Sequence, residues 1–90
     1  MNKEPVAKEV KTEMNEAMLD YALETTRKAF ERYNTDSDIA QYIKKEFDSH
    51  YDSTWHCVVG KTYGSFVSYE IGNFLDFVFN DKAVLLFKAG

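Results

Sequence analysis

The sequence predicts an α+β fold in which two N-terminal helices pack on an antiparallel β-sheet. Three observations support this prediction. Apolar residues recur at steps of three and four between about positions 14 and 51, which is the spacing of an amphipathic helix. From about position 54 the apolar residues alternate with a period of two, as in strands. A length of 90 residues with 44% hydrophobic residues indicates one small domain, residues 1–90, with its own core.

The N-terminal segment, residues 1–13, is polar and contains the one proline. Its start is expected to be flexible. Alternate residues in its second half nevertheless suit one side of a short edge strand: Val6, Lys8, Val10 and Thr12.

The first helix is expected to begin near Asn15, whose side chain is a good N-cap, and Met14 can pack on Leu19 one turn later. Asn34 is expected to end this helix in a left-handed conformation. The residues of the apolar face are Met18, Ala22, Ala29, Phe30 and Tyr33.

A second helix is expected directly afterwards, because the segment 35–38 reads Thr-Asp-Ser-Asp and resembles a capping box with acids in the first turn. Its apolar stripe repeats every four residues: Ile39, Ile43, Phe47 and Tyr51.

Four strands complete the predicted fold as a β-meander, at residues 54–59, 63–70, 74–79 and 82–88. Both faces of the first are largely apolar, which is typical of a central strand covered on both sides. Gly64 within the second strand indicates either close approach of another backbone or a bulge or corner in an ordinary hairpin. Asn80 and Asp81 favour a two-residue hairpin between the last two strands.

Several functional classes are disfavoured by composition. Eleven basic residues against 15 acidic ones give a net charge of −4, which argues against nucleic-acid binding. A single cysteine argues against an internal disulfide and favours a reducing compartment. The N-terminus has no apolar signal region, and no apolar run approaches the roughly 20 residues needed to insert into a membrane.

Catalysis is also not expected. His56 and Cys57 are neighbours on a predicted strand, so their side chains leave opposite faces and cannot form a catalytic dyad. The histidines and the cysteine lack the spacing of a zinc site, and no glycine-rich phosphate loop is present. We therefore predict a non-enzyme without cofactor or metal.

Longer motifs resemble a known family. The run KKEFD at residues 44–48 is followed by TWHCVVG at 54–60, GSFV at 64–67 and LLFKAG at 85–90. These motifs, and the chain from about Met14 onwards, resemble the hub-type cytoplasmic dynein light chain, a small dimeric protein that binds short linear peptides.

The resemblance implies a strand-exchanged homodimer, in which strand 63–69 pairs with the partner subunit's sheet. Two symmetric grooves would then bind partner segments, often centred on Thr-Gln-Thr, by β-strand addition, with the second helix as the other wall. The expected partners are the dynein intermediate chain and other proteins with short linear motifs. The expected location is the cytoplasm, on the microtubule-associated dynein motor complex. The alternative is a dedicated structural subunit that dimerises the intermediate chain without broad hub activity.

Carried over position by position, the resemblance names two sets of residues. The peptide-binding set is Asp36, Ser37, Lys61, Thr62, Tyr63, Gly64, Ser65, Phe66, Val67, Ser68, Tyr69, Phe74, Asp76 and Val78. The dimer-interface set is Lys44, Trp55, His56, Tyr63, Ser65 and Val67.

Some of these positions depart from the family pattern. Asp36 and Ser37 stand where the family has Glu-Lys, and Tyr69 stands where it has histidine. Asp76 and Val78 replace aromatic residues that help to line the pocket. Because lost apolar contacts weaken binding, we expect ordinary Thr-Gln-Thr peptides to bind about tenfold more weakly here.

Overall fold

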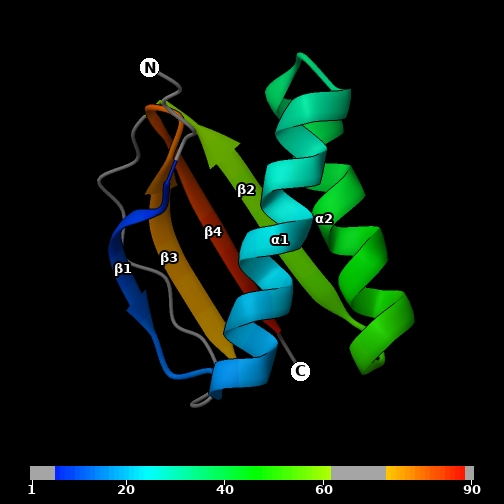
Figure 1. Cartoon of the computed structure of the whole chain (residues 1–90). Coiled ribbons are helices and arrows are strands. Elements are labelled where there is room, and N and C mark those ends of the chain that lie inside the picture. Colours follow the sequence, from blue (N-terminus) through cyan, green and yellow to red (C-terminus); the bar gives the residue numbers. More distant parts are fainter. Residues whose placement is uncertain (1–5, 62–72, 89–90) are drawn as a thin grey trace.

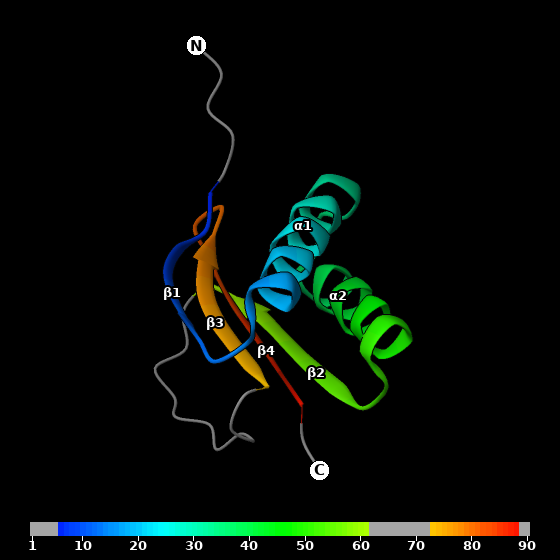
Figure 2. The ribbon, with the colours of Figure 1, turned by 60° about the horizontal axis from the view of Figure 1, so that its bottom comes forward.

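The structure is a computed structural model that describes residues 6–61 and 73–88. Its elements, in chain order, are β1 (Lys8–Thr12), α1 (Glu16–Arg32), α2 (Asp36–Tyr51), β2 (Trp55–Gly60), β3 (Phe74–Phe79) and β4 (Lys82–Lys88). The two helices lie side by side on one face of a four-stranded antiparallel sheet (Figures 1 and 2). The predicted α+β class with two helices on an antiparallel sheet is confirmed.

Both predicted helix starts are confirmed by their caps. The Asn15 side chain accepts a hydrogen bond from the Met18 N–H at 2.8 Å, and the Thr35 hydroxyl accepts one from the Asp38 N–H at 3.2 Å. The predicted end of the first helix is wrong in detail. Tyr33, in an extended conformation with φ −127°, caps α1, and its N–H donates to the Ala29 carbonyl. Asn34 is not in the left-handed region.

The strand order β1-β3-β4-β2 corrects the predicted meander. The β3–β4 hairpin is confirmed with the predicted bounds, and Asn80 and Asp81 have positive φ values of 52° and 65°, as a type I′ turn requires. However, β2 pairs with β4, from Trp55 opposite Lys88 to Gly60 opposite Ala83. Within the described residues β2 is therefore an edge strand and not a central one. The predicted strand 63–70 lies outside the described residues.

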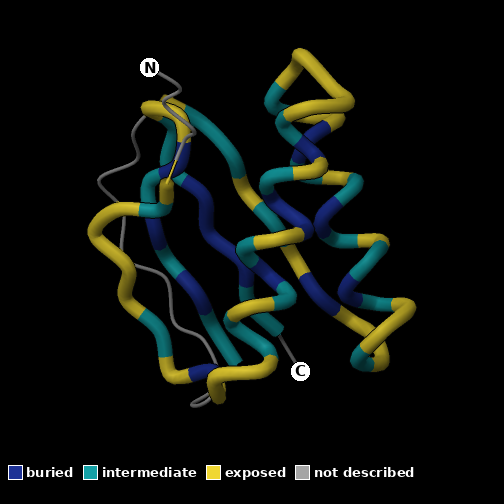
Figure 3. The backbone as a smooth tube through the Cα atoms, in the orientation of Figure 1, coloured by how far each residue is buried: buried dark blue, intermediate teal, exposed yellow. Residues whose placement is uncertain are grey.

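The predicted N-terminal edge strand is confirmed as β1, which pairs with β3 at the opposite edge of the sheet. Its predicted one-sided pattern is wrong, because Lys8 lies opposite Val78 on the outer face and Thr12 lies opposite the buried Leu75. Figure 3 shows that β1 is largely exposed, whereas β3 and β4 are buried or intermediate. The register of β1 shifts between Lys8 and Lys11, and Glu9 between them has a φ of 53°. Such an irregularity, with lysines on either side, disfavours the addition of a further strand at this edge.

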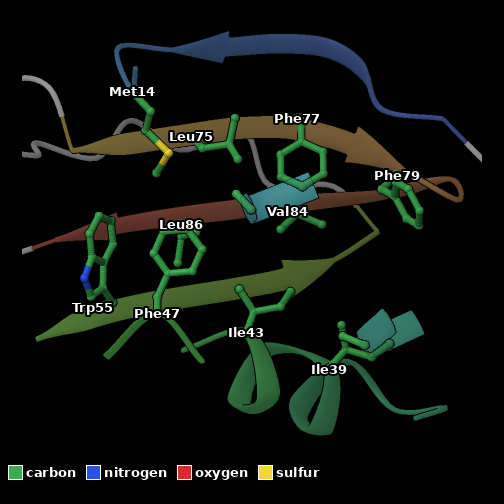
Figure 4. Packing of buried hydrophobic residues seen from close by; sticks show 12 residues of the cluster. Met14, Ile39, Ile43, Phe47, Trp55, Leu75, Phe77, Phe79, Val84 and Leu86 are labelled. Atoms are coloured by element: carbon green, nitrogen blue, oxygen red, sulfur yellow. The ribbon is translucent and has the colours of Figure 1, made fainter. Parts of the chain in front are cut away.

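The core lies between the helices and the sheet (Figure 4). Phe47 is fully buried, and its ring packs edge-on against Trp55 with centroids 4.8 Å apart. Ala22 and Ala29 are fully buried on α1, and Thr25 and Thr26 are buried beside them. The large residues that fill the core are Met14, Ile39, Ile43, Phe47, Trp55, Leu75, Phe77, Phe79, Val84 and Leu86.

The second face of the sheet carries apolar side chains as well as Asp76, and neither helix covers it (Figure 2). The register places Phe74, Phe87 and His56 in one row across this face, and the rings of His56 and Phe87 stack with centroids 5.3 Å apart. The next row contains Val58, which is 47% exposed. Both faces of β2 therefore carry apolar side chains, as predicted, but α2 covers only one of them.

Candidate functional site

A groove runs along the edge of β2 that faces away from β4. Within the described residues this edge pairs with no strand, and α2 forms the opposite wall. The groove has a volume of about 790 Å³. Its lining residues come from α2, β2 and β4: Asp36, Ser37, Ala40, Gln41, Lys44, His56, Cys57, Val58, Val59 and Phe87.

Main-chain groups of β2 point into this groove. The Trp55 N–H is directed away from β4, because it donates to the Asp48 carboxylate at 2.8 Å. Along an antiparallel strand, the N–H and C=O groups of successive residues point to alternate sides. The N–H and C=O groups of His56 and Val58 therefore face β4, while those of Cys57 and Val59 face the open edge. These groups can pair with an extended segment laid beside β2.

The α2 wall is one face of that helix, because its lining positions 36, 37, 40, 41 and 44 are separated by steps of three and four. The middle of the wall, formed by Ser37, Ala40 and Gln41, carries no charge. Each end has a lysine–aspartate ion pair. Lys44 donates to Asp48, and Lys82 at the start of β4 donates to Asp36.

Asp48 fixes the start of β2 against the end of α2. Its partial burial alone would raise the pKa of the carboxyl, but the hydrogen bonds from Lys44 and from the Trp55 N–H outweigh that effect and lower the pKa below its ordinary value. The folded state therefore favours the ionised carboxylate, which ties the first residue of the open strand to the helix.

We expect Asp48→Ala to lower the free energy of unfolding by about 1–3 kcal/mol, because the Trp55 N–H loses a charged acceptor. Since the pKa of Asp48 is lowered on folding, this stabilisation is complete above the ordinary carboxyl pKa and fades as the pH falls through the lowered value. Urea unfolding should show a larger difference from wild type at pH 7 than at pH 3. Asp20→Ala, on exposed α1 surface, is the control. An equal difference at both pH values would contradict this role.

The groove does not have the features of a catalytic or metal site. Burial raises the pKa of the Cys57 thiol to about 12, so the nucleophilic thiolate is strongly disfavoured at neutral pH. Across the part of the chain that the structure describes, no cluster of three histidine, cysteine or carboxylate side chains could hold a metal ion. In the same residues, neither helix is long and apolar enough to span a membrane.

The structure brings together four of the residues predicted from the resemblance. Asp36, Ser37, Lys44 and His56 all line the groove. Lys61 is exposed directly after β2. The predicted positions from Thr62 to Tyr69 lie outside the described residues.

The other predicted residues lie elsewhere. Phe74, Asp76 and Val78 are on β3, on the sheet face away from the helices, and β4 separates them from β2. The ring of Trp55 is 1% exposed and belongs to the core. Within the described residues its buried indole N–H has no hydrogen-bond acceptor. One chain therefore does not assemble the whole predicted site.

Sequence reasoning missed several lining residues: Ala40, Gln41, Cys57, Val58, Val59 and Phe87. A signal for two of them was available, because Ala40 and Gln41 lie one helical turn after Asp36 and Ser37 and must share their face. For the strand residues the signal was absent, since an open edge is a property of strand order.

The chain is similar in sequence to known proteins. The family model for dynein light chain type 1 matches residues 6–89. A cytoplasmic dynein light chain from Emericella nidulans is 49% identical over 85 residues, which cover 94% of this chain and 88% of the relative.

Two solved structures share the fold. The dynein light chain-like domain of the Fasciola hepatica calcium binding protein FhCaBP2 has a TM-score of 0.74 at 21% identity, over 98% of this chain and 95% of that one. The dynein light chain-like domain of CsTAL3 has a TM-score of 0.70 at 13% identity, with the same coverage of both chains.

Proposed function

This chain belongs to the dynein light chain type 1 family, and from that premise we propose that it is a non-catalytic, dimeric light chain of the cytoplasmic dynein motor complex. In this proposal it binds short linear segments of partner proteins, including the dynein intermediate chain, by β-strand addition. The observation that carries the proposal is the open edge of β2 beside the groove along α2. The cytoplasm, on microtubule-associated dynein, is the proposed location.

Strand addition suits this groove because its chemistry is mostly that of the backbone. The N–H and C=O groups of Cys57 and Val59 offer hydrogen bonds to a strand of the partner subunit, and the other edge of that strand then offers backbone hydrogen bonds to an extended ligand, whatever its sequence. The uncharged side chains on the α2 wall then meet alternate side chains of the added segment. Such a site binds many sequences in the same conformation, as a light chain with several partners requires.

Dimerisation is supported by the separation of the predicted site residues. Asp36 and Ser37 border the groove, whereas Phe74, Asp76 and Val78 lie on the second face of the sheet. A two-fold axis would bring one subunit's second face toward the other subunit's groove, and would cover the apolar surface around Val58 and Phe87. In the proposed dimer, residues 63–69 of the partner pair with β2, and the ligand adds beside them against α2.

Titration calorimetry with a synthetic Thr-Gln-Thr peptide tests the peptide-binding proposal. The expected result is one peptide bound per chain, with an affinity that rises about tenfold when Asp76 and Val78 are both replaced by tyrosine, because each ring restores apolar contact. A covalently paired peptide should bind far more tightly than the single one, since its second engagement is intramolecular. Absence of heat with either form, in wild type and in the double variant, would contradict the proposed function.

A further inference from the structure

The two ends of the groove differ in which member of the ion pair lines it. At the Trp55 end, Lys44 lines the groove, and Asp48 behind it also accepts the Trp55 N–H. At the other end, Asp36 lines the groove, and Lys82 approaches it from β4. Lys82 directly precedes Ala83, which pairs with Gly60, so this second ion pair lies at the Gly60 end of β2.

The Lys82–Asp36 pair is a tertiary contact, since the two residues are 46 positions apart and join the start of β4 to the start of α2. Both side chains are partly exposed, Lys82 by 32% and Asp36 by 37%. A pair with this exposure contributes little to stability, because water screens it. Its larger effect is on the electrostatic potential that a ligand in the groove would experience.

We infer that Lys82 sets the charge preference of the groove at the start of α2. By pairing with the Asp36 carboxylate, Lys82 cancels the negative charge that this end would otherwise present to a bound segment. The inference rests on the proposed function and deepens it, because it names the side chain that keeps the groove from favouring basic segments at this end. The groove therefore binds an extended segment whose affinity does not increase when a basic residue lies at this end.

The distance between the two charged ends of the groove determines how many ligand residues lie between them. From Asp36 to Lys44 the helix rises about 12 Å, which corresponds to about four residues of an extended strand. A ligand therefore has a core of about four residues facing uncharged wall, and its two flanks meet different charges. Only the flank beside Asp36 is expected to respond to Lys82.

Four synthetic peptides with a Thr-Gln-Thr core test this inference, with lysine or glutamate on either the N-terminal or the C-terminal flank. For wild type, calorimetry should show lysine and glutamate peptides within about twofold of each other at the flank beside Asp36. In Lys82→Met, the lysine peptide should bind about threefold or more tightly than the glutamate peptide at that flank, because Asp36 is released.

Two further variants assign the effect to this pair. Lys28→Met removes an equal charge from exposed α1 surface and should keep the wild-type ratio. The double variant Asp36→Asn/Lys82→Met should lose the preference for lysine that Lys82→Met creates. A Lys82→Met ratio equal to that of wild type at both flanks, with binding retained, would overturn the inference alone. If no peptide bound to any variant, the proposed function would fail, and this inference with it.

Discussion

Replacing Phe47 with alanine is expected to lower the free energy of unfolding by about 3–5 kcal/mol. The Phe47 ring is fully buried and packs against Trp55, Tyr21 and Tyr51, with centroid distances of 4.8, 5.5 and 5.2 Å. It joins α2 to the first residue of β2 and to α1, so its removal leaves a cavity where three elements meet. Native domains have only about 5–15 kcal/mol of stability in total, so this change removes a large fraction of it.

Urea unfolding followed by circular dichroism measures this change. All variants are compared at one protein concentration, because association would add to the apparent stability. Tyr33→Ala removes an aromatic ring that is 37% exposed, and should change the free energy of unfolding by less than about 1 kcal/mol. If Phe47→Ala and Tyr33→Ala had equal effects, the described core would be incorrect.

Val59→Pro should weaken the pairing of the partner's strand with the open edge while β2 stays paired with β4. The Val59 N–H faces the groove, so proline removes a donor from the open edge and none from the β2–β4 ladder. The loss of one hydrogen bond at each of two edges, at about 1.4 kcal/mol each, corresponds to about a hundredfold weaker dimer.

The matched control is Val58→Pro, one residue away. The Val58 N–H faces Leu85 on β4, so this proline breaks the ladder inside the sheet and should destabilise the fold itself. Circular dichroism and sedimentation velocity together separate the two outcomes. A Val59→Pro protein that stays folded and dimerises as tightly as wild type would show that the β2 edge is not an association surface.

The elements were largely predictable from sequence because each has a strong local signal. The four-residue repeat of Ile39, Ile43 and Phe47 predicts α2, and Thr35 before it is a typical N-cap residue. Asn80 and Asp81 tolerate positive φ, which is why the β3–β4 hairpin was found with its bounds. The burial of Thr25 and Thr26 gave no such signal, because small polar residues read as helix surface unless the neighbouring helix approaches closely.

Strand order was not predictable, and the site depends on it. Local alternation shows that both faces of β2 are apolar, but it cannot say whether a helix, a second sheet or a partner covers the outer face. The interpretation of β2 as a central strand was therefore wrong for the described chain. Asp36, Ser37, Lys44 and His56 were identified from the resemblance, whereas the Lys82–Asp36 pair joins positions that no local pattern connects.

Sedimentation equilibrium of the wild-type protein at tens of micromolar tests the central claim most directly, because the proposed groove needs two subunits. We expect a single species with twice the 10.5 kDa mass of the chain, which dissociates only on dilution. A species of 10.5 kDa throughout that concentration range would contradict it.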